Sequence, residues 1–305
     1  MLGVALTLAN STREIIKRKT VFSQPPIFHC LFPDSPKSTQ MARSSPPDWR
    51  RPPGVASGTW QYVNQRSIAD HYDDFVADTP LCGLDHQILQ QEFPQRTNSK
   101  KDSRIVADLG CGTGRAAKSL MVRGYDYLGI DLSQSMLEQT RDKLESIDEA
   151  GQLVGLIRAN LVQLEGIADD SFSDAICLFS TLGMIQSRQN RHRFLKHVRR
   201  LVPSGGKFVL HVHNRWSALR ESRGVLKLTA SWFRSIRDSK HEFGDATYSY
   251  RGLDQMFMHR FSARELRKDL AASGWMIQKF HRVSIDGSRI LARGKLAGGF
   301  VVVAV

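Results

Sequence analysis

The sequence lacks the features that mark disulfide-stapled or membrane-spanning proteins. Its 305 residues include only four cysteines, and no paired spacing relates Cys30, Cys82, Cys111 and Cys177. We therefore expect reduced thiols and a cytoplasmic protein. No apolar run approaches the roughly 20 residues that a spanning helix needs. The short apolar opening has no basic residues ahead of it, which is not typical of a secretory signal, so we expect no membrane partner.

Charge is distributed unevenly along the chain. The net charge is +13, yet residues 61–187 carry 11 Lys and Arg against 19 Asp and Glu. Residues 188–305 reverse this balance, with 24 basic against 8 acidic side chains. A basic half favours a polyanionic partner such as a nucleic acid, although basic residues that merely solvate helices would give the same counts.

Proline, glycine and serine interrupt the first part of the chain. Residues 1–58 are expected to form a disordered N-terminal extension, because the apolar residues there follow neither a helical nor a strand period. Met41 lies within this extension, and we interpret it as a candidate translation start. Residues 59–305 are expected to form one domain. Apolar residues between Trp60 and Leu89 recur at mixed helical spacings, which predicts one or two helices ahead of its core.

Short apolar runs then alternate with amphipathic stretches. This alternation predicts an α/β fold, with a mostly parallel sheet of seven strands and helices on both faces. We expect a helix over 188–202 with its arginines outward, and another that begins at the capping box Ser262 to Glu265. Strands are expected at 105–109, 127–130, 153–157, 175–179, 207–212, 276–283 and 300–305.

Three alternating glycines follow the first of these strands. Gly110, Gly112 and Gly114 come directly after the run that ends at Leu109, and a second apolar run ends at Asp131. Glycine lets a ligand approach the backbone more closely than a Cβ would permit. A carboxylate at the end of the next strand can accept hydrogen bonds from both ribose hydroxyls. The order predicts a pocket for a nucleoside-bearing cofactor.

The spacing of these glycines decides which cofactor is expected. Dinucleotide sites place two residues between the second and third glycine, whereas one residue separates each pair here, with Asp108 ahead of them. The segment resembles motif I of the class I S-adenosylmethionine-dependent methyltransferases, and the resemblance extends from about Tyr72 to Val305. It implies a Rossmann-like sheet whose last strand is antiparallel, and S-adenosyl-L-methionine as the cofactor.

The resemblance also implies roles for single residues. Asp108 would hold the amino group of the cofactor, and Asp131 the ribose hydroxyls. Leu132 would pack on adenine. Asn160, which is followed by Leu161, occupies a position near adenine where the family often has an acidic residue. Phe179 lies in the loop that closes over the methyl group, and Tyr72 resembles a tyrosine-bearing lid. The methionine moiety would lie along Gly110, Cys111, Gly112 and Gly114.

A histidine pair ends the strand expected at 207–212. His211 and His213 share one side of that strand because side chains alternate with a period of two. His213 is the candidate catalytic base, and a core histidine is the alternative interpretation. No carboxylate or thiol at ligand spacing accompanies the pair, so we expect no metal. The insertion over 214–261 leaves the sheet at this end and is expected to lie over the substrate mouth.

Three functions stay open at this point. The first is methyl transfer to a small-molecule acceptor. The second is a tRNA methyltransferase, because Gly244-Asp245 and His259 to Ser262 are similar to the tail of enzymes that modify the wobble uridine. The third is a non-catalytic protein that binds S-adenosylmethionine. The glycine spacing disfavours a nicotinamide-dependent reductase, and nothing in the sequence indicates an oligomeric state.

Overall fold

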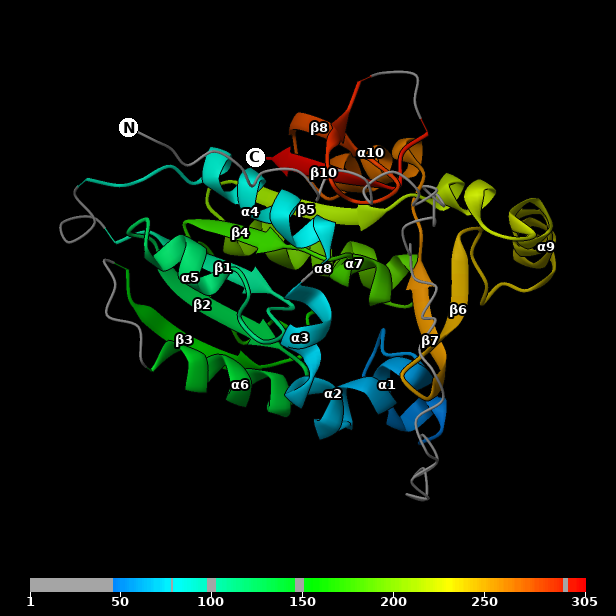
Figure 1. Cartoon of the computed structure of the whole chain (residues 1–305), viewed down its shortest axis with the longest axis horizontal. Helices are drawn as coiled ribbons and strands as arrows, with labels where there is room; N and C mark the ends of the chain where they lie inside the picture. The colour runs from blue at the N-terminus through cyan, green and yellow to red at the C-terminus, as the bar shows by residue number, and fades with distance from the viewer. Residues whose placement is uncertain (1–45, 78, 98–102, 146–150, 293–295) are drawn as a thin grey trace, which may run out of the picture. The chain divides into compact units, whose positions relative to one another are not determined.

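The computed structural model describes residues 46–305 apart from 78, 98–102, 146–150 and 293–295. An eight-stranded sheet with the order β3-β2-β1-β4-β5-β10-β8-β9 runs through the described residues (Figure 1). The strands are β1 (Ile105–Leu109), β2 (Asp126–Asp131), β3 (Leu153–Arg158), β4 (Asp174–Cys177), β5 (Phe208–His213), β8 (Ile277–Val283), β9 (Ile290–Leu291) and β10 (Gly299–Ala304).

The direction of the strands confirms the predicted sheet. Strands β1 to β5 pair in parallel, and β10 runs antiparallel to both β5 and β8. The seven expected strands all form within two residues of their predicted ends. The eighth, β9, has only two residues and pairs with the edge strand β8. A strand this short has too few residues to show a period of two in the sequence.

Side chains that alternate along the strands build two separate cores. Phe208, Leu210 and Val212 of β5 face the helices α8 (Arg188–Leu201) and α10 (Ala263–Ala272). Val209, between them, faces the opposite side, where the helices are α4 (Pro80–Glu92), α5 (Ala117–Met121) and α6 (Gln134–Leu144). Both faces of the sheet are therefore covered, as expected for a parallel sheet.

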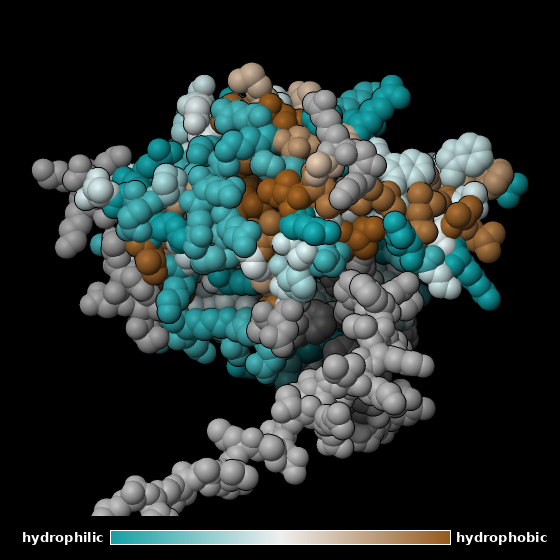
Figure 2. Space-filling view, turned by 45° about the horizontal axis from the view of Figure 1, so that its top comes forward, coloured by the Kyte–Doolittle hydropathy of each residue, from teal (hydrophilic) through white to brown (hydrophobic). Residues whose placement is uncertain are grey.

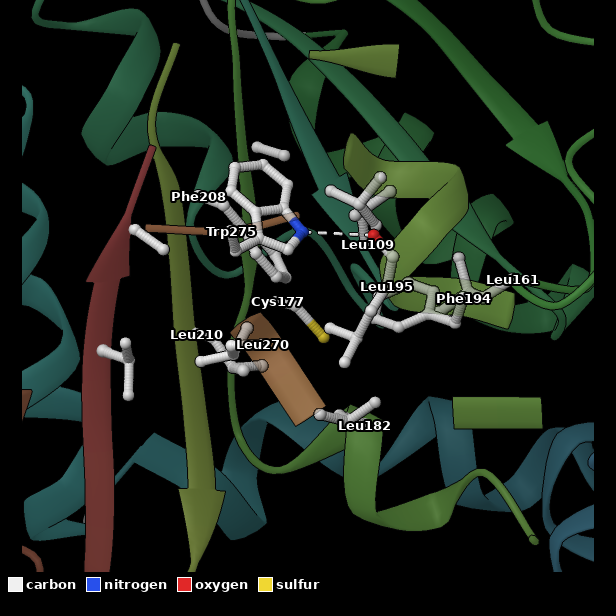
Figure 3. Packing of buried hydrophobic residues seen from close by; sticks show 14 of the residues in the cluster. Leu109, Leu161, Cys177, Leu182, Phe194, Leu195, Phe208, Leu210, Leu270 and Trp275 are labelled. Atoms are coloured by element: carbon white, nitrogen blue, oxygen red, sulfur yellow. Dashed lines mark hydrogen bonds between the residues drawn. The ribbon is translucent and has the colours of Figure 1, made fainter. Parts of the chain in front are cut away.

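An indole anchors the core under α8. Figure 3 shows Trp275 packed on Phe208, with the ring centroids 5.0 Å apart. Its Nε1–H donates to the carbonyl of Leu195, at 3.1 Å. The buried indole thus has its polar group satisfied while it fills the space between the sheet and the helix.

The segment ahead of β1 has more helices than the sequence indicates. The structure contains α1 (Ser57–Asn64), α2 (Arg66–Asp70), α3 (Tyr72–Ala77) and α4, where one or two helices were expected between 60 and 89. Gln65 is extended and separates α1 from α2. Pro80 holds Thr79 extended ahead of α4, as the residue before a proline tends to be.

Most of the expected N-terminal extension, with Met41 and Cys30, lies outside the described residues. Its last part, residues 46–58, is packed against the domain. Val55 is 8% exposed and forms a β-bridge with Ile185. The carbonyl of Gly54 accepts a hydrogen bond from the backbone of Gln186, at 2.8 Å.

The insertion after β5 contains two helices and a hairpin. These are η2 (Arg215–Arg220), α9 (Gly224–Arg237), and the strands β6 (Asp245–Tyr250) and β7 (Leu253–His259). The hairpin packs on α1 so closely that a Cβ at Gly58 would lie 2.1 Å from the carbonyl oxygen of Gln255. Two segments almost 200 residues apart in the sequence therefore meet beside the sheet (Figure 1).

One arginine of α8 corrects the prediction for that helix. Phe194, Leu195, Val198 and Leu201 are buried, but Arg191 does not point outward. Its side chain is fully buried, and its guanidinium pairs with Glu242 of the insertion at 2.6 Å. The sequence of α8 alone could not show this partner, which lies 51 residues further along the chain.

Replacement of Arg191 by leucine tests this buried ion pair. We expect Arg191→Leu to lower the free energy of unfolding by roughly 3 kcal/mol, the lower end for a broken buried pair, because Glu242 keeps some solvent contact. Urea denaturation measures the loss. The matched control is Arg193→Leu on the exposed side of the same helix, which should change stability by less than about 0.5 kcal/mol. Equal losses in the two variants would contradict the role of the pair.

Candidate functional site

The glycine loop after β1 has a backbone that other residues rarely adopt. Gly110, Gly112 and Gly114 have φ of 81°, 55° and 71°. A Cβ at Gly110 would lie 2.3 Å from Thr181, and one at Gly114 would lie 2.6 Å from Thr140. At Gly112 the nearest atom would be 3.9 Å away. The outer glycines are thus needed for packing, whereas the middle one has room for a side-chain atom, in ordinary contact with Tyr72.

Asp131 fixes this loop to the end of β2. One carboxylate oxygen accepts from the backbone N–H of Gly112 at 2.9 Å, and the other accepts from Ser133 at 2.8 Å. Burial raises the pKa of Asp131, while these backbone donors oppose the rise. A carboxylate offers about four acceptor positions, so two hydrogen bonds leave capacity for a diol.

Asp108 lies buried at the end of β1. Its side chain accepts a hydrogen bond from the hydroxyl of Tyr127 at 2.9 Å. Burial raises the pKa of Asp108 to about 7, although the Tyr127 hydroxyl and the Arg115 guanidinium both lower it. The protonation of Asp108 will therefore respond to any cation that approaches the glycine loop.

Helix α3 is tied to the same loop. Thr113 donates a hydrogen bond to Asp73 at 2.6 Å. Lys143 of α6 pairs with Asp73 and donates to the carbonyl of Thr113 at 2.8 Å. This contact brings Tyr72 over the loop, since its Cε1 is the nearest atom to a Cβ built on Gly112. Burial raises the pKa of Tyr72, so its phenol stays protonated.

Three further tyrosines that the sequence did not single out pack in this region. Tyr62 of α1 and Tyr250 of the hairpin have ring centroids 6.0 Å apart. Together with Tyr72 and Tyr248 they surround the cluster formed by α2, Met136 and the hairpin. Four of the six tyrosines in the chain thus lie in the two segments that flank the sheet. The clustering of these tyrosines in two segments of the sequence could have indicated that they pack together.

The histidine pair lies on the sheet face that carries α4 and α5. The rings of His211 and His213 are 5.6 Å apart and nearly perpendicular, so the two do share one side of β5. Burial lowers both pKa values to about 3, so both imidazoles are neutral at physiological pH. Nδ1 of His211 has no hydrogen-bond partner among the residues that the structure describes.

A buried ion pair, missed in the sequence, lies between the loop and these histidines. Arg115 pairs with Asp85 of α4 at 2.7 Å. Its guanidinium also lies over the ring of Phe179, 5.1 Å from the centroid. The charge of Arg115 lowers the pKa values of Asp108 and His211. Phe179 and Ser180 have positive φ of 55° and 66°, and strained backbone of this kind is often found at functional sites.

Comparisons with known proteins agree with this geometry. Residues 107–210 match the family model described as a methyltransferase domain. A putative methyltransferase from Geobacillus sp. (strain WCH70) is 23% identical over 50% of this chain. The chain spans 59% of the length of that relative.

Solved structures extend the likeness beyond the matched region. The CcbJ methyltransferase from Streptomyces caelestis has a TM-score of 0.57 and 18% identity, over 80% of this chain and 96% of its own. The 1,6-didemethyltoxoflavin-N1-methyltransferase from Burkholderia thailandensis has a TM-score of 0.52 and 16% identity, over 83% and 92%. The chain has the fold of the S-adenosylmethionine-dependent methyltransferases. At these identities the structural likeness shows the fold alone.

Two residues expected near adenine also have packing roles. Asn160 donates to the carbonyl of Pro53 at 2.9 Å, and its oxygen accepts from the backbone of Val162 at 3.1 Å. Leu161 is buried in the core under α8. Asn160 thus joins the segment at 46–58 to the loop after β3.

Two other residues of the expected cofactor site differ in exposure. Leu132, next to Asp131 in the sequence, is half-buried. The side chain of Cys111 is buried, and its thiol would lie 2.9 Å from a Cβ at Gly129. Cys111 can therefore face a ligand only through its backbone.

Carboxylates and an imidazole also lie close together beside the insertion. Ligand atoms of Glu242, His259 and Glu265 lie within 4.8 Å of one another. The two imidazole nitrogens of His259 contact Asp245 at 2.6 Å and Glu265 at 2.9 Å. Arg191 pairs with Glu242 and Arg215 with Glu265. Because these ligand atoms already face protein partners, we assign no metal to this group.

The same network explains the tail pattern seen in the sequence. Asp245, His259 and Glu265 join the hairpin to the N-terminus of α10, where the predicted capping box of Ser262 and Glu265 forms. Gly244 has a φ of 116°, and a Cβ there would lie 2.3 Å from the carbonyl of Arg260. These residues therefore have a structural role in the domain.

The raised pKa of Asp108 predicts a pH dependence of stability. The fold favours the protonated carboxyl, so its contribution is full below about pH 4 and is lost as pH rises through about 7. Between these limits the wild type should lose about 4 kcal/mol relative to Asp108→Asn, which cannot ionise. Denaturation of both proteins across this range measures the difference. Parallel stability curves would contradict the assigned protonation of Asp108.

Proposed function

We propose that this domain binds S-adenosylmethionine and transfers its methyl group to a small-molecule acceptor. The observation that carries the proposal is the uncrowded backbone of Gly112 beside Asp131, where a Cβ would meet only Tyr72, at 3.9 Å. A loop that leaves room over its middle glycine can receive a ligand against the backbone. Asp131 keeps acceptor capacity for a ribose after it has bonded the loop.

Each part of the cofactor has residues that suit it in this proposal. The methionine moiety would lie along Gly110, Cys111, Gly112 and Gly114. The adenine would pack against Leu132, with Asn160 and Leu161 at its edge. Asp108 would face the ammonium group. A cation there favours the ionised carboxylate, so binding would lower the pKa of Asp108 from about 7.

The side chains around the acceptor would act mainly by positioning it. Bound S-adenosylmethionine supplies an electrophilic methyl carbon together with its leaving group, and alignment of an acceptor can lower a barrier by about 7–11 kcal/mol. His213 is neutral, so its imidazole can accept a hydrogen bond from a hydroxyl or amine and orient it. To take the proton as well, the imidazole requires a bound acceptor that raises its pKa from about 3. Phe179 and Tyr72 would close the site over the methyl group and exclude water.

A tRNA acceptor is the second candidate of the sequence, and the contacts of α8 weigh against it. Arg188 pairs with Asp269, Arg191 with Glu242, and Arg200 with Asp169 and two backbone carbonyls. Arginines engaged in this way are less available to phosphates. A tRNA acceptor requires binding with a steep salt dependence, and absence of tRNA binding at low salt would exclude it.

The remaining candidates are separated by two direct measurements. Calorimetry with S-adenosylmethionine and with NAD distinguishes a methyltransferase from a reductase. Release of S-adenosylhomocysteine on addition of an acceptor distinguishes an enzyme from a protein that only binds the cofactor. We expect the protein to bind S-adenosylmethionine and not NAD. We also expect it to release S-adenosylhomocysteine when a small-molecule acceptor is added.

Asp131→Ala tests the ribose contact. We expect the dissociation constant for S-adenosylmethionine to rise at least 30-fold, about 2 kcal/mol, because two charge-assisted hydrogen bonds are lost. Calorimetry measures the affinity. The matched control is Asp126→Ala at the other end of β2, which should leave the affinity within about twofold. Unchanged binding in Asp131→Ala would refute the proposed cofactor site.

His213→Ala tests the proposed base. Turnover should fall roughly a hundredfold, the usual contribution of a general base, with the affinity for S-adenosylmethionine unchanged. Release of S-adenosylhomocysteine gives the rate, and calorimetry gives the affinity. The control is His86→Ala on the exposed side of α4, which should keep full turnover. Normal turnover in His213→Ala would remove the catalytic role.

A further inference from the structure

Helix α9 of the insertion turns its apolar side to solvent. Its exposed large side chains are Val225 at 60%, Leu226 at 65%, Trp232 at 47%, Phe233 at 53% and Ile236 at 64%. We call these five residues the α9 apolar face. Figure 2 shows brown side chains gathered over this side of the molecule, with teal ones between them. Trp216 and Leu219 of the adjoining η2 are also exposed.

The opposite side of α9 contacts the domain mainly through small and polar residues, and Leu228 is the half-buried apolar residue among them. Gly224 is buried, and Ser231 and Ser235 are half-buried along the same side. A Cβ at Gly224 would lie 1.7 Å from the carbonyl oxygen of Ala218. The hydroxyl of Ser231 bonds with His241 at 3.1 Å. A surface helix usually buries its apolar stripe. Helix α9 does the opposite, because its apolar side faces solvent.

Basic residues border the α9 apolar face. Residues 216–240 contain six Lys and Arg against two Asp and Glu. At 100° per residue, Arg237 lies at one edge of the apolar arc, and Lys227 and Arg234 lie beyond it. Arg234 and Lys227 are 66% and 52% exposed, and each also has an acidic neighbour. Long basic side chains beside aromatic ones are typical of helices that lie in a membrane interface.

We propose that α9 docks on the surface of an anionic lipid bilayer, with its apolar face in the headgroup boundary and its arginines against phosphates. No described helix is long and apolar enough to cross a membrane. The 14 residues of α9 span only about 21 Å, so the helix would lie along the surface. This changes the expectation of no membrane partner, which rested on spanning segments alone.

The chemistry of the α9 apolar face disfavours the other occupants. A second copy of this chain, docked face to face, would bring two basic borders together, and like charges repel. RNA could pair with the arginines, and its bases could stack on Trp232 and Phe233. The aliphatic side chains of Val225, Leu226 and Ile236 can neither stack with bases nor pair with phosphates. A lipid surface satisfies the apolar and the basic residues together.

Cosedimentation of the full chain with vesicles tests the proposal. We expect binding to vesicles of phosphatidylglycerol and phosphatidylcholine at least tenfold stronger than to phosphatidylcholine alone. The variant Trp232→Ser, Phe233→Ser, Ile236→Ser should lose this binding at least tenfold. All three positions are exposed, so its thermal unfolding should match that of the wild type. The control is Trp49→Ser, which removes an exposed tryptophan outside α9 and should bind as the wild type does.

A second variant separates charge from apolar contact. Arg234→Glu with Arg237→Glu keeps the α9 apolar face and should weaken binding to anionic vesicles alone. Three results would overturn the proposal. They are wild-type protein that binds neither vesicle, a triple variant that binds normally, and wild-type protein that self-associates or binds RNA through α9 without binding vesicles.

Discussion

The link between Asp131 and the backbone of Gly112 holds the candidate site together. It joins the carboxyl end of β2 to the loop that follows β1, and these two strands are neighbours in the sheet. Because Gly110 and Gly114 pack against threonines with no room for a Cβ, the loop cannot relax away from the sheet. The space over Gly112 is a consequence of these two constraints.

Burial gives this edge of the sheet unusual protonation states. Asp108 has a pKa of about 7, while His211 and His213 have pKa values of about 3. The ion pair of Arg115 with Asp85 lies among them. The domain therefore holds two neutral imidazoles and a carboxyl whose pKa lies near neutrality, and the charge of Arg115 lowers the pKa values of Asp108 and His211. Such separation of pKa values is a frequent property of catalytic sites.

The sequence predicted those parts of the molecule whose pattern is local. Strand β1 was predicted at both ends because four apolar residues and Asp108 stop at a glycine turn, and the helix predicted at the capping box forms as α10. The positions of Gly110 to Asp131 required only the order of strand, turn and acid. The family itself was predicted from the spacing of three glycines.

The rest depends on partners far away in the sequence. The burial of Arg191 requires Glu242 of the insertion. The packing role of Asn160 requires Pro53, which composition had assigned to a disordered extension. The outward apolar side of α9 could not be predicted either, since helical periodicity shows that a helix has two sides and does not show which side is buried.

The most direct measurement is a crystal structure of the chain with S-adenosylhomocysteine. We expect both ribose hydroxyls within hydrogen-bond distance of Asp131, the methionine moiety over Gly112, and the sulfur directed toward the side of the sheet that carries His213. A nucleoside bound elsewhere, or a ribose with no contact to Asp131, would contradict the proposed site.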